Sequence, residues 1–477
     1  MPSSGKDLEF VILHHGVGEE VVGNLVELLL SGSIDLDFDR FADADGTDSL
    51  EAEMLHRSPC GNTSRIENRG LRHNSDDSFH EKRKIGPSSP RDKSKGEVCG
   101  ILRFFFSRPE RSFILPSMKS SSKNAPYEFL KKLLNTPSPS GFETRGQKVW
   151  VDYVSQFADS VEVDAYGNAF ATLNPKGDPS ILISGHVDEL GLMVSHISEE
   201  GYLYFKGIGG VDKALIRGQR VTVHGTKGSI PGVTGLLAIH LQEPDDRNKV
   251  PEMHVMHIDI GVSSRKEAEK LVAVGDPITY SAEFQELAGG RFAARGCDNR
   301  IGAWAAAEGL RLASLKKGSL KAKLVAVSTI QEENGLYGAS MAGYSVHPDV
   351  ALVVDVTHAT DIPNCSKQKH GEVALGKGPV ISLGSVNHPV VNARLREAGK
   401  KAGIALQSEA NPRWTGTDAD AIFKQKGGIP TVSIGVPNRY MHSPVEMIQY
   451  SDLEETAELL AAFALEARKG ERFGVKL

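Results

Sequence analysis

Several short apolar runs, separated by helix-like segments, constrain the fold of this chain more than any other feature. The clearest runs are KLVAVSTI (323–330), ALVVDV (351–356) and TVSIGV (431–436), and the segment at 299–317, NRIGAWAAAEGLRLASLKK, is typical of a helix. Alternation of buried strands with helices predicts a largely parallel sheet covered by helices on both faces. The expected class is therefore α/β, with a mostly parallel (mixed) sheet.

The chain divides into regions of different composition. Residues 1–120 are mostly polar, and such sequence buries too little apolar surface to offset the entropy of ordering, so we expect a disordered extension, with Met118 as an alternative start. Residues 195–292 are rich in glycine and short alternating strands, which indicates a small inserted β-rich domain. The α/β domain is then discontinuous, formed by residues 124–194 and 293–470. The run SILISGHVDELGLMVSHI (180–197) is typical of a buried strand.

Composition excludes several classes of partner. The net charge of −6 leaves no basic footprint for nucleic acid. No apolar run reaches membrane-spanning length, so no membrane partner is expected. The cysteines are few and lack CxxC spacing, and the N-terminus lacks the layout of a secretion signal. These features predict a reduced, cytoplasmic protein.

Acidic and histidine side chains gather where the predicted strands end, and in open α/β sheets the carboxyl ends of the strands form the site. The residues concerned are His186, Asp188, Asp298, Glu332, Glu333, Asp355, Arg439 and His442. Without cations, so many carboxylates at one sheet edge would repel one another. Nitrogen and oxygen ligands of this kind suit zinc, cobalt or manganese. Two such ions about 3.5–4 Å apart, bridged by a carboxylate, would offset the charge and activate a water.

Four of these residues also have a simpler interpretation. Asp298 could cap the following helix, Asp355 could serve a turn, His442 could be a satisfied loop histidine, and Asp188 could hydrogen-bond the imidazole of a neighbouring histidine. The adjacent pair of glutamates in QEEN (331–334) follows a strand. Because neighbouring side chains in extended backbone point to opposite sides, we expect the two carboxylates to have different roles.

Five motifs in this order and spacing, GHVDELG, RGCDNRIG, QEENGLYGA, VVDVTHATD and YMHSPVE, resemble the dinuclear-metal aminopeptidases of the glutamyl aminopeptidase and tetrahedral (TET) aminopeptidase family. The resemblance covers about residues 124–470, and some members carry a cellulase or endoglucanase label. It implies two divalent metal ions per subunit, zinc, cobalt or manganese. The implied ligands are His186 and Asp355 at one ion, Glu333 and His442 at the other, and Asp298 bridging both. By the same resemblance Asp188 fixes the tautomer of His186, and Glu332 is the general base.

The resemblance also places a segment near the substrate, which nominates Gly416, Thr417 and Asp418 for substrate binding, although an ordinary helix cap explains them as well. Arg439 could hold a carboxylate of the ligand or of the protein, or lie on the surface. Cys297 stands where many relatives have a hydrophobic or acidic residue, so its thiol is either an alternative ligand or a small neutral neighbour.

The function that the resemblance implies is metal-dependent removal of N-terminal residues from short peptides. It also implies a homo-oligomer, up to a dodecamer built from dimers that are joined through the inserted domain. The alternatives are a dinuclear deacylase or carboxypeptidase, a degenerate scaffold that only binds peptides, and an endoglucanase. The last needs two carboxyl groups facing one sugar bond and has no use for the histidines. The preferred N-terminal residue is not indicated by the sequence.

Overall fold

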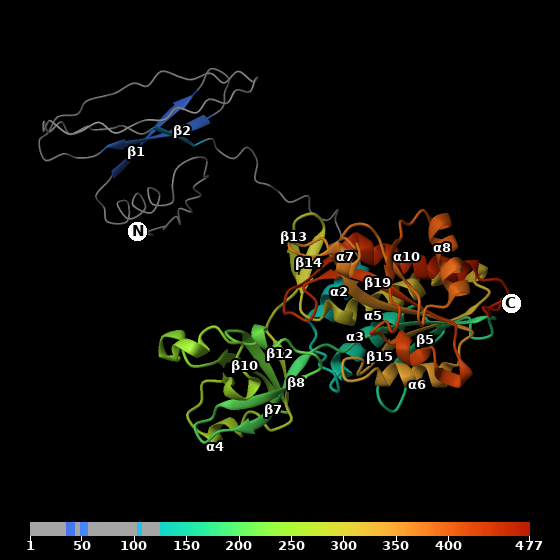
Figure 1. Cartoon of the computed structure of the whole chain (residues 1–477), viewed down its shortest axis with the longest axis horizontal. Coiled ribbons are helices and arrows are strands. Elements are labelled where there is room, and N and C mark those ends of the chain that lie inside the picture. The colour runs from blue at the N-terminus through green and yellow to red at the C-terminus, as the bar shows by residue number, and fades with distance from the viewer. Residues whose placement is uncertain (1–34, 43–47, 56–102, 107–124) are drawn as a thin grey trace, which may run out of the picture. The chain divides into compact units, whose positions relative to one another are not determined.

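The computed structural model describes residues 35–42, 48–55, 103–106 and 125–477, and the chain separates into two compact units, Met1–Ile114 and Leu115–Leu477 (Figure 1). In the first unit the described residues form an antiparallel sheet of β1 (Asp35–Ala42), β2 (Asp48–Leu55) and β3 (Arg103–Phe106). The other residues of the expected disordered extension, Met118 among them, lie outside the described residues.

The second unit is built on a mixed sheet whose centre is parallel. The apolar runs of the sequence form β6 (Ser180–His186), β15 (Lys323–Thr329), β16 (Val350–His358) and β19 (Thr431–Arg439), which pair in parallel in the order β19-β16-β6-β15. Antiparallel strands extend both edges. They are β4 (Ser160–Val163), β5 (Ala169–Leu173), β13 (Gln285–Leu287), β14 (Arg291–Ala294) and β20 (Glu446–Gln449), and the branch off β19 holds β17 (Val380–Leu383) and β18 (Gln407–Ala410). The predicted α/β class is confirmed.

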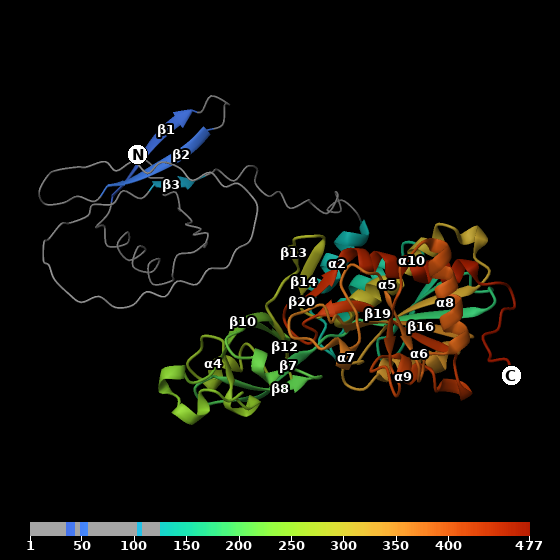
Figure 2. The same cartoon turned by 45° about the horizontal axis from the view of Figure 1, so that its top comes forward.

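Helices cover both faces of this sheet (Figure 2). One layer consists of α2 (Ala125–Asn135), α3 (Thr144–Val154), α5 (Cys297–Ser314), α8 (Pro389–Ala402) and α10 (Tyr450–Glu466), whose apolar side chains share one core with the sheet. On the opposite face, α6 (Tyr337–Val346) and α9 (Ala419–Ile422) close a second, smaller core. In the part of the chain that the structure describes, no helix combines the length and the apolar character needed to cross a bilayer.

One close approach fixes where the sheet meets its main helix. A Cβ atom at Gly185 would lie 2.2 Å from the carbonyl carbon of Gly302, so only glycine allows α5 to pass this near β6. The contact brings the start of α5 against the carboxyl end of β6, beside His186.

A closed six-stranded barrel is inserted between β6 and β13. Its strands are β7 (Gly191–Ile197), β8 (Leu203–Ile208), β9 (Arg220–Gly225), β10 (Gly228–Gly235), β11 (His257–Asp259) and β12 (Pro277–Tyr280), with the short α4 (Arg265–Ala268) beside them and a separate apolar core inside. The interpretation of residues 180–197 as one strand is wrong, because the run contributes β6 to the large sheet and β7 to the barrel. The break falls at Asp188 and Glu189, whose buried carboxylates accept hydrogen bonds from other segments.

Candidate metal centre

Five of the residues singled out in the sequence meet at the carboxyl edge of the central strands. Their ligand atoms form two groups, within each of which all lie within 4.8 Å of one another. One group is His186, Asp298 and Asp355, and the other is Asp298, Glu333 and His442. They come from the end of β6, the start of α5, the turn after β15, the middle of β16 and the turn between β19 and β20.

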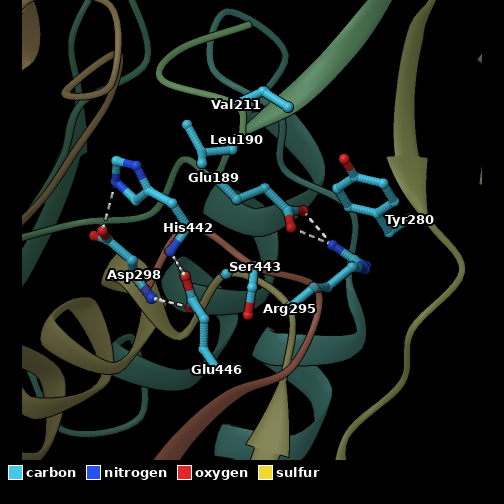
Figure 3. Close-up of a pocket in the computed structure, with 10 residues that line it drawn as sticks. Glu189, Leu190, Val211, Tyr280, Arg295, Asp298, His442, Ser443 and Glu446 are labelled. Carbon is cyan, nitrogen blue, oxygen red and sulfur yellow. Dashed lines mark hydrogen bonds and ion pairs between the residues drawn. The ribbon is translucent and has the colours of Figure 1, made fainter. Parts of the chain in front are cut away.

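Asp298 belongs to both groups because its two oxygens face different histidines. Its Oδ1 lies 3.3 Å from Nε2 of His186, and its Oδ2 lies 3.3 Å from Nε2 of His442. Figure 3 shows the imidazole of His442 directed at the Asp298 carboxylate. Asp355 Oδ1 is 3.9 Å from His186 Nε2, and Glu333 Oε2 is 4.0 Å from His442 Nε2. A carboxylate with one oxygen in each group has the geometry of a bridging ligand.

The donor set fits divalent cations. Nε2 of His186 and Oε1 of Glu333 are buried and have no hydrogen-bond partner, and buried polar atoms of a native fold are normally satisfied. Imidazole nitrogens and carboxylate oxygens are the ligands that zinc, cobalt and manganese accept. Cys297 belongs to neither group, since its buried thiol contacts the backbone oxygens of Ala294 and Glu446, each at 3.7 Å.

The electrostatics of the cluster agree with this fit. Burial raises the pKa of Glu332 to about 10, against a lowering influence of His186 and with a further rise from Asp355. Burial also raises the pKa values of Glu333 and Asp355 well above the ordinary range of a carboxyl group. For His186, burial alone would lower the pKa, but the surrounding carboxylates outweigh it and hold the pKa well above the ordinary value. The protein's own residues therefore leave an excess of negative charge that a cation would offset.

Asp188 lies behind the cluster and contacts His186, Glu332 and Glu333. Its Oδ1 is 3.3 Å from Nδ1 of His186, the ring nitrogen opposite the one in the metal group. The same oxygen accepts a hydrogen bond from the backbone N–H of Glu332, and Oδ2 accepts one from the backbone N–H of Glu333, each at 3.2 Å. Asp188 is fully buried, so these contacts are shielded from water.

The two adjacent glutamates do not lie in extended backbone, so the strand argument for their opposite directions is wrong. β15 ends at Thr329, Gln331 has a positive φ of 50°, and the N–H of Gly335 donates to the carbonyl of Glu332 at 2.9 Å in a turn. Both carboxylates face the cluster. Oε2 of Glu332 lies 3.6 Å from His186 Nε2, while Glu333 faces the other histidine.

A cleft of about 1250 Å³ opens from the cluster, and Gly416 and Thr417 line it. Asp418 is instead buried under the cluster, where it accepts hydrogen bonds from Ser184 and Thr329. The guanidinium of Arg439 binds the protein's own Asp361, at 2.9 and 2.7 Å, and does not line the cleft. Asp418 is therefore not placed for direct substrate contact, and Arg439 holds a carboxylate of the protein, which is one of the alternatives that the sequence left open.

Glu446 was not among the residues predicted from the sequence. Its two oxygens accept hydrogen bonds from the backbone N–H groups of Asp298 and His442, each at 2.8 Å (Figure 3). It stands four residues after His442 in the quoted YMHSPVE motif, so its position was visible but its contacts were not. Glu189, which follows Asp188, is buried against Arg295 and Arg300 and, like Glu446, lines the small pocket drawn in Figure 3.

Comparisons with known proteins agree with this architecture. A model of the M42 glutamyl aminopeptidase family matches residues 167–459. The lysyl aminopeptidase of Pyrococcus furiosus is 36% identical over 349 residues, covering 72% of this chain and 97% of that protein. The glutamyl aminopeptidase of Lactococcus lactis is 28% identical, covering 70% and 95%.

Solved structures give the same result. A TET aminopeptidase from the marine archaeon Thaumarchaeota archaeon SCGC AB-539-E09 matches with a TM-score of 0.68 and 34% identity, covering 72% of this chain and 96% of that chain. The TET1 peptidase of Pyrococcus horikoshii, described as assembling into a tetrahedron or a large octahedral shell, matches with a TM-score of 0.64 and 32% identity, covering 72% and 100%. A Thermotoga maritima structure named endoglucanase has a TM-score of 0.57 and 27% identity, covering 70% and 96%.

Proposed function

Because the chain belongs to the M42 glutamyl aminopeptidase family and is therefore an aminopeptidase, we propose that it removes N-terminal residues from short peptides by hydrolysis at the described cluster, with two divalent metal ions. The observation that carries the proposal is the shared position of Asp298 in both groups of ligand atoms.

In this proposal each group of residues holds one ion. His186 and Asp355 bind the first, Glu333 and His442 bind the second, and Asp298 bridges the two. When bound, the ions supply Lewis acidity, which polarises a peptide carbonyl and lowers the pKa of a water molecule.

Glu332 is the proposed general base. Its Oε2 lies beside the cluster, 3.6 Å from Nε2 of His186, where it can accept a proton from the attacking water. The same oxygen can then return that proton to the nitrogen of the leaving amine, so that one side chain serves both halves of the reaction. A positioned base of this kind contributes about 10²–10⁴-fold to the rate. Asp188 holds the base in place through the backbone of Glu332 and orients the ring of His186.

Assembly into a homo-oligomer, up to a dodecamer, is the second part of the proposal. The barrel exposes several apolar side chains between β10 and β11, with exposed fractions of 46–69% for Leu237, Ile239, Leu241 and Val255. Large exposed apolar side chains that gather in one segment favour a protein interface there. Mass photometry of the chain, begun at Met1 and at Met118, tests this part, and a monomer in both cases contradicts it.

The catalytic proposal is tested with the full chain, stripped of metal by a chelator and reloaded with zinc, cobalt or manganese in turn. We expect hydrolysis of aminoacyl reporters with a free α-amino group, only in the presence of an added ion. Cleavage of N-acetylated or C-terminal reporters instead would favour the deacylase or carboxypeptidase. Activity on a β-glucan that survives the chelator would favour a glycosidase.

The names of relatives leave the preferred residue open, since one is called a lysyl and another a glutamyl aminopeptidase. The preference of this chain depends on the side chains that line its own cleft.

A further inference from the structure

A half-buried carboxylate in the wall of the cleft has no cationic partner among the residues that the structure describes. Glu409, on β18, accepts hydrogen bonds from the hydroxyl groups of Thr357 and Ser382, and from Nδ2 of Asn411 at 3.2 Å. All three donors are neutral, and no lysine, arginine or histidine of the described residues forms an ion pair with it. Because a carboxylate has about four acceptor positions and three are used, one remains for a ligand.

Glu409 lies close to the metal cluster. Its hydrogen-bond partner Thr357 follows the proposed metal ligand Asp355 by two residues on β16. The side chains of Asp355 and Thr357 therefore project from the same face of the strand, about 7 Å apart. A cation bound by Glu409 therefore belongs to the side chain of a residue next to the bond that is cut. An aminopeptidase cuts between the N-terminal residue and the second residue, and of these two we place the N-terminal side chain at Glu409.

The other charged groups along the cleft are either exposed or part of the metal cluster. Lys367, Lys369, His370 and Glu372 line its outer wall and are exposed, and Lys367 is paired with Glu372. His358 also lines the cleft and is exposed. Water and salt screen exposed charges, whereas a half-buried carboxylate interacts more strongly with a bound cation. The carboxylates at the cluster itself are taken up by the two proposed ions.

From this arrangement we infer that Glu409 is a specificity-determining residue that selects peptides with an N-terminal lysine or arginine. The inference rests on the proposed aminopeptidase function and deepens it by naming the substrate class. A long aliphatic side chain that ends in a cation reaches from the cluster to the carboxylate. An N-terminal glutamate or aspartate would place two negative charges together and is disfavoured.

The test compares the metal-loaded full chain with its Glu409→Gln variant on lysyl, arginyl, leucyl and glutamyl reporters. Glutamine has nearly the same shape, and the hydroxyls of Thr357 and Ser382 can rotate to accept from its amide, so the fold is retained. The wild type should prefer lysyl and arginyl reporters. The substitution should lower the lysyl-to-leucyl ratio of kcat/KM by about tenfold to a hundredfold, the usual effect of losing a charged hydrogen bond.

Two further variants sharpen the result. Glu409→Asp keeps the charge and should retain more of the lysyl preference than Glu409→Gln. Glu372→Gln removes an exposed carboxylate from the outer wall and should leave the ratio within about twofold of the wild type.

Three outcomes overturn the inference while leaving the aminopeptidase intact. The first is a wild type that does not prefer lysyl and arginyl reporters. The second is an equal fall of kcat/KM on all reporters in Glu409→Gln, as expected if Glu409 bound the α-amino group. The third is a preference for basic residues only at the second position of dipeptides. Hydrolysis of none of the reporters with any ion would overturn the proposed function, and this inference with it.

Discussion

Asp188 accepts a hydrogen bond from the backbone N–H of Glu332, at 3.2 Å, and thereby ties the proposed base to the strand that ends in His186. The other oxygen of Asp188 holds the next backbone N–H in the same way. One buried carboxylate thus positions the base, the neighbouring ligand and the imidazole together. This contact joins two segments that lie 144 residues apart in the sequence.

Asp188→Asn should therefore lower activity and metal affinity together. The amide keeps one acceptor but directs its NH₂ group at another donor, so one of the backbone hydrogen bonds is lost. We expect a fall of about 10–100-fold in kcat/KM or in metal affinity. Steady-state kinetics and a metal titration measure it, with Asp152→Asn, from an exposed pair with Lys148, as the control. An Asp188→Asn variant with wild-type values in both would contradict the assigned role.

The two adjacent glutamates should give different phenotypes. Glu332→Gln should retain nearly normal metal content and lose most turnover, about 10²–10⁴-fold in kcat, because it removes the proton acceptor. Glu333→Gln should instead lose metal first, visible as fewer than two ions per chain by elemental analysis. Loss of metal in the Glu332 variant, with full activity per bound ion, would show that the two roles are wrongly assigned.

The sequence predicted the sheet and the strand ends well, because buried parallel strands carry continuous apolar runs that need no knowledge of their partners. KLVAVSTI became β15, and the polar residues after each run do meet at one edge. The local path after the strand was not predictable from periodicity. Gln331 takes a positive φ, and the chain turns before Glu332, so neighbouring side chains do not alternate there as they do in a strand. The roles of the metal ligands remain predictions.

Contacts between distant segments could not be predicted from the sequence either. Glu409 and Glu446 are ordinary glutamates in the sequence, and their importance comes from partners that only the fold brings near. The break between β6 and β7 also depends on contacts between distant segments. Asp188 and Glu189 interrupt the apolar run, which only weakly indicates a break, and the hydrogen bonds that hold these two residues outside the sheet come from other parts of the chain.

Glu446→Gln should loosen the bridging ligand. Its carboxylate now accepts from the backbone of both Asp298 and His442, and the NH₂ group of glutamine cannot accept from a second N–H. We expect at least a tenfold fall in affinity for one of the two ions, with kcat partly recovered at high metal concentration. Glu458→Gln, from an exposed position on α10, is the matched control. If added metal recovered none of the lost activity, Glu446 would not act through the ligands.

Removal of metal should lower the thermal stability. An ion present at about a thousand times its Kd stabilises the folded state by roughly 4 kcal/mol, because it binds the assembled cluster and not the unfolded chain. The melting temperature measured by differential scanning fluorimetry should therefore fall by about 5 °C for each ion removed by the chelator and recover on reloading. Asp355→Asn should reduce the difference between the two states. An identical melting temperature with and without chelator would argue against metal at this cluster.

The free energy of unfolding should depend on pH through His224, a residue of the barrel. Burial lowers the pKa of His224 to about 4, and the positive charges of Arg145 and Arg295 act in the same direction. Both ring nitrogens bind neutral hydroxyls, at 3.2 and 2.9 Å. Between this pKa and the ordinary value near 6.5, the unfolded chain binds a proton that the folded chain does not. The contribution to stability is therefore complete above the ordinary pKa and is lost as the pH falls through this window.

His224→Gln should flatten this dependence, because glutamine keeps a polar group in the site but does not titrate. Allowing for the part of the ring that remains exposed, the free energy of unfolding of the wild type should lose about 1–2 kcal/mol more than that of the variant between pH 7 and pH 4. Urea unfolding at a series of pH values measures the difference. His196→Gln, an exposed histidine on β7, serves as the control. Parallel curves for wild type and His224→Gln would mean that His224 takes up its proton in the folded barrel as readily as in the unfolded chain.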